Sequence, residues 1–202
     1  MLTTKEAIEQ RRSIRKFRPD AVPQDQINAL LDSARLAPSA CNAQPWRFNV
    51  VTDEATRRKL AQAAFNQSFI AGAPVVFVCC VDIKGYLDGS VSGTQDLGKI
   101  KAVDEYVADV VLDRINNVSK MNFEEIGVRI ALNAAIAIEH IVLRALDFGL
   151  GTCWVRLFEE EKIKSIFGWG KNISVVSLLP AGYPAEFPPP RKRLSLNDIL
   201  IS

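Results

Sequence analysis

Apolar residues recur at helical spacing in the first part of the chain. Thr3 and Glu6 have the spacing of a capping box, so we predict a short helix from Thr4 to about Gln10. Prolines 19 and 23 precede a second helix, which is expected to end before Pro38 because proline disrupts a helix interior. Its periodic apolar residues are Ile27, Leu30, Leu31, Ala34 and Leu36. One face of this helix should therefore lie in the core.

Short apolar stretches farther along the chain predict β-strands. The candidates are bounded by turn residues and are rich in Val, Ile and aromatic side chains. They are Trp46–Thr52, Ala73–Val78, Thr152–Arg156 and Ile173–Ala181. Two further helices are predicted at about 54–64 and 159–167. Strands and helices thus mix along one chain.

The longest helical pattern runs from Phe123 to Phe148 and is apolar on nearly every side. Gly149 follows it as a typical helix stop. Such a helix is expected at the centre of a domain or in a dimer interface. Residues 83–122 are instead rich in glycine, serine and charge, with one helical candidate at about 104–115. We predict a variable surface excursion or a mobile lid there.

Composition narrows the class of protein. A chain of 202 residues that is 48% hydrophobic can bury one substantial core. Its net charge of +2 does not favour nucleic acid. Apolar stretches such as Ala73–Val81 are too short to span a bilayer, and the first residues do not resemble a signal peptide. We expect a single domain over 1–202, cytoplasmic, that binds neither nucleic acid nor membrane.

The cysteines and the single histidine exclude several kinds of catalytic site. Cys41, Cys79, Cys80 and Cys153 have neither CxxC spacing nor the density of a disulfide scaffold, so we predict no metal site. His140 is the only histidine and lies in a helical pattern. Ser-His-Asp, Cys-His and multi-histidine zinc sites do not fit this arrangement.

Two groups of basic residues are candidates for binding a phosphate. Arg11, Arg12 and Arg15 lie near the start, and Arg191–Arg193 lies near the end. Guanidinium groups bind phosphate through charge-assisted, often bidentate hydrogen bonds. Either group alone is more often part of a solvated surface than a phosphate site.

The loop Pro38–Gln44 carries polar groups on a restrained backbone. Ser39, Asn42 and Gln44 could hydrogen-bond a heterocycle edge or sugar hydroxyls, although a plain loop before a strand has the same pattern. The run Gly149–Thr152 has neither the GxGxxG nor the GxxxxGK[ST] pattern, and it follows a helix. We therefore exclude a Rossmann or a Walker nucleotide site.

Four segments, in this order, resemble the flavin-dependent nitroreductase family. They are Arg11–Phe17, Ala37–Trp46, Gly149–Trp154, and Gly182-Tyr183-Pro184 with the later Arg191–Arg193. The resemblance extends from about Glu6 to Leu194 and is weak only in residues 83–122. It implies an α+β fold, a three-layer α/β/α sandwich with a mixed, mainly antiparallel sheet and helices on both faces. It also implies an intertwined homodimer with two FMN sites at the subunit interface.

The resemblance assigns roles to individual residues. Arg11, Arg12 and Ser13 would hold the FMN phosphate and ribityl chain. Arg15 would reach the pyrimidine edge, and Gln67 is a weaker candidate for a ring contact. The other subunit would supply Pro38, Ser39, Ala40 and Asn42. The backbone along the flavin edge would come from Gly151, Thr152, Cys153 and Trp154. Arg191 and Arg193 would return to the phosphate.

The implied activity is NAD(P)H-dependent and passes through FMN by ping-pong hydride transfer to an electron-poor small molecule such as a nitroaromatic or a quinone. NADH and NADPH are equally consistent with the sequence. One alternative is another flavin reaction, such as enone or flavin reduction or a dehydrogenation. A second is a flavin-binding sensor without turnover. His140 and Cys153 are expected to be structural, not catalytic.

Overall fold

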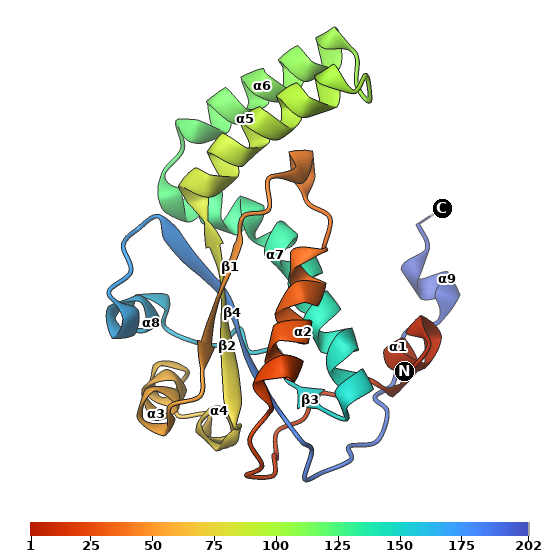
Figure 1. Ribbon diagram of the computed structural model, residues 1–202, viewed down its shortest axis with the longest axis vertical. Helices are drawn as coiled ribbons and strands as arrows, with labels where there is room; N and C mark the ends of the chain where they lie inside the picture. The colour runs from red at the N-terminus through yellow and green to blue at the C-terminus, as the bar shows by residue number, and fades with distance from the viewer. Residues whose placement is uncertain (202) are drawn as a thin grey trace.

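A four-stranded antiparallel sheet forms the centre of the computed structural model, which describes residues 1–201 (Figure 1). The strand order is β1-β2-β4-β3, and each neighbouring pair is antiparallel. The strands are β1 (Trp46–Val51), β2 (Val75–Asp82), β3 (Gly151–Thr152) and β4 (Ile173–Gly182). An isolated parallel bridge joins Ser13 to Thr152 at the β3 edge. The α+β class with a mainly antiparallel sheet is confirmed.

Helices cover both faces of the sheet and extend beyond it. The larger helices are α2 (Gln24–Arg35), α3 (Glu54–Ala63), α5 (Ile83–Lys99), α6 (Glu105–Ser119), α7 (Phe123–Ala145) and α8 (Glu160–Phe167). The shorter ones are α1 (Thr4–Gln10), η1 (Ala40–Asn42), α4 (Ser68–Gly72), η2 (Leu146–Phe148) and α9 (Leu196–Ile199). Helices α2 and α7 cover one face, and α3, α4 and α8 cover the other (Figure 1). Helices α5 and α6 form a hairpin that projects past the end of the sheet.

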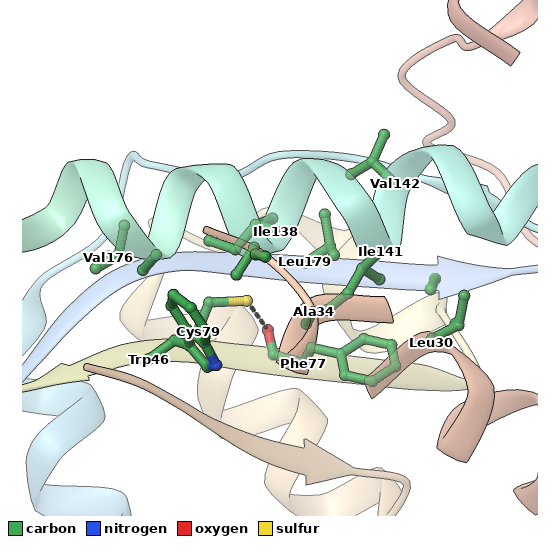
Figure 2. Close-up of a cluster of buried hydrophobic side chains, with 14 of the residues drawn as sticks. Leu30, Ala34, Trp46, Phe77, Cys79, Ile138, Ile141, Val142, Val176 and Leu179 are labelled. Atoms are coloured by element: carbon green, nitrogen blue, oxygen red, sulfur yellow. Dashed lines mark hydrogen bonds between the residues drawn. The ribbon is translucent and has the colours of Figure 1, made fainter. Parts of the chain in front are cut away.

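The two cores follow from the alternation of side chains along β2. Phe77 and Cys79 point to one face, where they pack with the buried side of α7. Figure 2 shows Ile138 and Ile141 of α7 in this cluster. The intervening Val78 belongs to the opposite cluster with residues of α3, α4 and α8. Since both faces of β2 are covered, its apolar run is nearly continuous.

The long helix is confirmed as α7, which continues through η2 to Phe148. Gly149 ends it with φ +67°, a conformation that glycine adopts without strain. Phe123–Phe148 is long and apolar enough to cross a membrane by length and composition, so the expectation that every apolar stretch is too short was wrong. In the structure, half of the residues in the most apolar part of this segment are buried inside the protein. Its outer side leaves Val128 and Leu132 about 70% exposed (73% and 70%).

Three sequence-based expectations were wrong in detail. Residues 83–122 form the α5–α6 hairpin, although only a helix at about 104–115 was expected. Helix α5 was not predicted because its glycines lower the helix propensity of this segment. The five-residue α4 was missed, and the strand expected at Thr152–Arg156 is limited to β3 plus a bridge from Val155 to Leu178.

Candidate functional site

The arginine-rich segment that follows α1 lies along the edge of β3. Helix α1 ends where the Arg11 N–H donates to the Ala7 carbonyl at 3.0 Å. Ser13 then bridges to Thr152, and the Ile14 N–H donates to the Thr152 carbonyl at 2.9 Å. Two motifs about 140 residues apart in sequence are thus joined through their backbones.

The other side of this segment pairs with residues that follow β4. The Arg18 N–H donates to the Tyr183 carbonyl at 2.8 Å, and the Ala185 N–H donates to the Lys16 carbonyl at 2.9 Å. The Arg15 N–H donates to the Glu186 carboxylate at 2.7 Å. The backbone that carries Arg15 is therefore fixed by contacts to two separate parts of the chain.

The arginine side chains of this segment carry unneutralised charge. Among residues 1–201, Arg11, Arg12 and Arg15 form no ion pair, whereas nearby Arg18 pairs with Asp20 at 2.8 Å. Arg12 donates to the Glu9 and Arg11 carbonyls. Unpaired guanidinium groups gathered in one place favour an anionic ligand.

Gly151 allows the arginine segment to approach β3 closely. A Cβ at this position would lie 2.4 Å from the Ile14 side chain, closer than real atoms pack. A cavity of about 380 Å³ opens beside this contact, and its lining includes Arg11, Arg12 and Thr152. The cavity, the cations and the glycine backbone form one candidate binding site.

Cys153 lies inside this cluster as a buried thiol. Burial raises its pKa, and the nearby Arg15, Ser13 and Arg11 only partly oppose that effect. The thiol also donates weakly to the Trp154 carbonyl at 3.7 Å. A protonated, buried thiol fits the expected packing role.

Gln67 belongs to the segment that approaches Arg15 through Phe69. The Arg15 guanidinium carbon is 5.9 Å from the centroid of the Phe69 ring, two residues beyond Gln67. The Gln67 side chain caps the preceding turn, because its Nε2 donates to the Ala64 carbonyl at 2.9 Å and to the Leu157 carbonyl at 3.0 Å. Gln67 is two residues from Phe69, but its amide N–H groups already have partners.

The Pro38–Gln44 loop lies elsewhere on the molecule. The Ala40 N–H donates to Asn133 Oδ1 at 2.9 Å, and Asn133 is in the first half of α7. The arginine cavity contacts α7 at Val142, nine residues farther on, which is about 14 Å along a helix. Within one chain the structure does not bring Pro38, Ser39, Ala40 and Asn42 to the arginines (Figure 1).

The second basic group and His140 are also separate from the cavity. Every residue from Arg191 to Ile201 is exposed, and no hydrogen bond or ion pair within 1–201 joins Arg191 or Arg193 to the arginine segment. His140 Nδ1 is 3.1 Å from the Ser33 carbonyl, a contact between α7 and α2. That contact is the structural role expected for His140.

Two residues of the site are not among those predicted from the sequence. Glu186 holds the Arg15 backbone, and Phe69 lies against the Arg15 guanidinium. Glu186 follows the Gly182-Tyr183-Pro184 motif by two positions, so that motif could have indicated it. Phe69 lies in the missed helix α4, and its contact depends on tertiary structure alone.

The chain matches a known protein family over most of its length. The nitroreductase family model matches residues 8–183, which include the arginine segment, β3 and β4. The chain belongs to the nitroreductase family. The resemblance to this family is thereby confirmed.

Individual relatives are similar over most of the chain. A Thermus thermophilus protein named NADH dehydrogenase is 32% identical over 208 residues, covering 100% of this chain and 96% of its own length. The Bacillus subtilis FMN reductase [NAD(P)H] is 24% identical and is covered over 66% of its length, with 91% of this chain aligned. A structure from Exiguobacterium sibiricum solved in complex with FMN has a TM-score of 0.79 and 25% identity, with 100% and 98% of the two chains covered.

Proposed function

We propose that the protein is a homodimeric, FMN-dependent NAD(P)H oxidoreductase that reduces electron-poor small molecules such as nitroaromatics or quinones. The observation that carries this proposal is the set of unpaired arginines beside the Gly151 backbone in a chain of the nitroreductase family. The names of the NADH dehydrogenase and FMN reductase relatives, and the FMN-bound relative, support it.

The donor set fits the phosphate of FMN. A phosphate monoester carries close to two negative charges at neutral pH and offers oxygens for bidentate hydrogen bonds. Arg11 and Arg12 line the cavity and have no carboxylate partner, and Ser13 follows them on the same segment. These three residues would hold the phosphate and the ribityl chain, with Arg191 and Arg193 approaching from the exposed tail.

Arg15 and the β3 region would face the ring. Bound FMN supplies the hydride chemistry, taking two electrons from NAD(P)H and delivering them to the acceptor. Arg15 would place a positive charge beside the ring and would favour its reduced, more negative state. The backbone of Gly151, Thr152, Cys153 and Trp154 would lie along the ring edge, with Gln67 near Arg15.

A second copy of the chain would complete the site. The Pro38–Gln44 loop is about 14 Å along α7 from the arginine cavity of its own chain. Val128 and Leu132 on α7, and the apolar tail residues Leu194, Leu196 and Ile199, are exposed in the single chain. Pairing of two copies would cover them, and would bring Pro38, Ser39, Ala40 and Asn42 to the other copy's arginines.

The remaining expectations belong to the same proposal. The chain would act as a single cytoplasmic domain over 1–202. The α5–α6 hairpin occupies the segment 83–122, which was predicted as a surface excursion or lid. In the proposed enzyme it would lie beside the acceptor pocket. Metal, membrane and nucleic acid have no part in the proposed reaction.

Steady-state assays with a panel of acceptors test the proposed reaction. The purified protein, reconstituted with FMN, is mixed with NADH or NADPH and then with a nitroaromatic, a quinone, an enone or free flavin. Rapid NAD(P)H consumption with the nitroaromatic or the quinone supports the proposal. Turnover with the enone or free flavin alone favours another flavin reaction. Bound FMN without any turnover favours a sensor.

A further inference from the structure

Helix α5 packs directly against the backbone of the Pro38–Gln44 loop. A Cβ at Gly93 would lie 1.6 Å from the Cys41 carbonyl oxygen, and a Cβ at Gly89 would lie 2.8 Å from the Ala43 carbonyl oxygen. Both distances are shorter than any real Cβ contact. The loop can therefore occupy its position only because these two helix positions have no side chain.

The loop backbone needs such support. Cys41, Asn42 and Gln44 have φ of 50°, 51° and 47°, in the left-handed region that non-glycine residues rarely adopt. A strained backbone of this kind persists only where its surroundings hold it. Helix α5 packs against this backbone and is one of the elements that hold it.

Asn133 of α7 supplies the second support. Its Oδ1 accepts from the Ala40 N–H at 2.9 Å, and its Nδ2 donates to the Ile130 carbonyl at 3.1 Å. The residue is only 8% exposed, so both ends of its amide are fixed in the interior. The loop is thus held between α5 on one side and α7 on the other.

Helix α5 is itself anchored to the sheet. It begins directly after β2, where the Asp82 carboxylate accepts from the Gly85 N–H at 2.9 Å. The Ile83 N–H donates to the Asn172 carbonyl at 2.9 Å. Because the start of α5 is fixed to the sheet, the part of α5 that contacts the loop has a defined position relative to the sheet.

We infer that the α5–α6 hairpin is a buttress for the Pro38–Gln44 loop, with Gly93 and Asn133 as positioning residues that set FMN affinity through that loop. This inference rests on the proposed function for the role of the loop in FMN binding. The contact between hairpin and loop is present without any ligand.

The test compares two glycine substitutions in the same helix. Gly93→Ala forces the loop away from α5, whereas Gly98→Ala has nothing within 4 Å of the new methyl group and is the matched control. Cys41 reports the loop position, because it is the partly exposed thiol among the described cysteines. Burial raises the pKa of Cys80 to about 12, and Cys79 and Cys153 are also buried.

Two readouts are taken on the full chain. In the FMN-free protein, the rate at which a thiol reagent labels Cys41 should change at least about threefold in Gly93→Ala and stay at the wild-type value in Gly98→Ala. The Kd for FMN should rise about tenfold or more in Gly93→Ala alone, with a changed visible circular dichroism of the bound flavin. Wild-type labelling or a wild-type Kd in Gly93→Ala overturns the inference.

Asn133→Ala tests the other support without changing α5. It removes the acceptor of the Ala40 N–H and should also change Cys41 labelling and raise the Kd for FMN. A wild-type Kd in this variant likewise contradicts the role of Asn133. If the wild-type chain binds no FMN at all, the proposed function fails, and the labelling experiment still decides whether the hairpin positions the loop.

Discussion

At the scale of single residues, Arg15 combines a backbone held by a carboxylate with a guanidinium that lies near an aromatic ring. Its backbone is held by Glu186 at 2.7 Å, and its guanidinium lies against Phe69 without a carboxylate partner within residues 1–201. Arg35, by contrast, pairs with Asp32 at 2.8 Å on the exposed side of α2. A charge that the protein leaves unneutralised and fixes in place is available to a ligand.

Replacing Arg15 should therefore change the redox behaviour of bound FMN. Arg15→Ala removes a positive charge beside the ring, so the midpoint potential should fall by about 30 mV or more, which is about 1.4 kcal/mol for two electrons. Spectroelectrochemical titration of the FMN complex measures it, and Arg35→Ala is the control. An unchanged potential together with normal FMN affinity would contradict the role of Arg15.

Site residues could be predicted where they belong to a short motif that is recognisable in the sequence. Arg11, Ser13 and Arg15 were named from the sequence, and the structure joins their segment to Thr152 of the Gly149–Trp154 motif. Glu186 was not predicted because its carboxylate binds a backbone N–H 171 positions away. Only its place two residues after the Gly182-Tyr183-Pro184 motif could have indicated it.

At the scale of helices and strands, predictability followed the strength of the apolar pattern. Helix α7 and strand β2 have long apolar runs that are buried on opposite sides of one core, and both were predicted. The bounds of the long helix were close, whereas the strand expected at Ala73–Val78 starts at Val75 and continues to Asp82. Helix α5 was missed because Gly85, Gly89 and Gly93 weaken its propensity. The same glycines serve a tertiary contact, since two of them meet the Pro38–Gln44 loop.

The junction of β2 and α5 should respond to acid. Partial burial acts to raise the pKa of Asp82, but hydrogen bonds from Gly85, Asn172 and Arg47 outweigh it, and the pKa is lowered. A lowered pKa in the folded state contributes stability above the unfolded value of about 4, and this contribution is lost as the pH falls below it.

Urea unfolding at pH 7 and at pH 3 measures this contribution. Asp82→Asn should lower the free energy of unfolding at pH 7 and differ less from the wild type at pH 3. Asp109→Asn, an exposed position on α6, serves as the control and should cost little at either pH. An equal loss at both pH values for Asp82→Asn would show that the charge of Asp82 is not what stabilises the junction.

At the scale of the whole molecule, the site is divided between two places. The arginine segment, β3 and the turn after β4 are joined within one chain, while the Pro38–Gln44 loop is held at a distant part of α7. Arg191 and Arg193 lie on an exposed tail. The sequence could name these residues, but in the proposed dimer they meet only when a second copy is present, which no apolar or polar pattern within one chain encodes.

Dimerisation should accordingly be coupled to FMN binding. We expect a particle of twice the chain mass of 22.3 kDa in analytical ultracentrifugation. Leu132→Arg places a charge on the exposed apolar side of α7 and should shift the protein to monomers and raise the Kd for FMN at least about tenfold. Arg114→Ala, on α6, is a comparison variant for a general surface effect. A monomer that binds FMN with wild-type affinity would contradict the shared site.

The most direct test of the central claim is the visible absorption spectrum of the purified protein, recorded with FMN before and after addition of NADH or NADPH under anaerobic conditions. We predict the visible absorption bands of a protein-bound flavin, as expected for a flavoprotein cofactor. The longer-wavelength band should bleach on addition of NAD(P)H and return when a quinone is added. A colourless protein that does not bind added FMN would contradict the account.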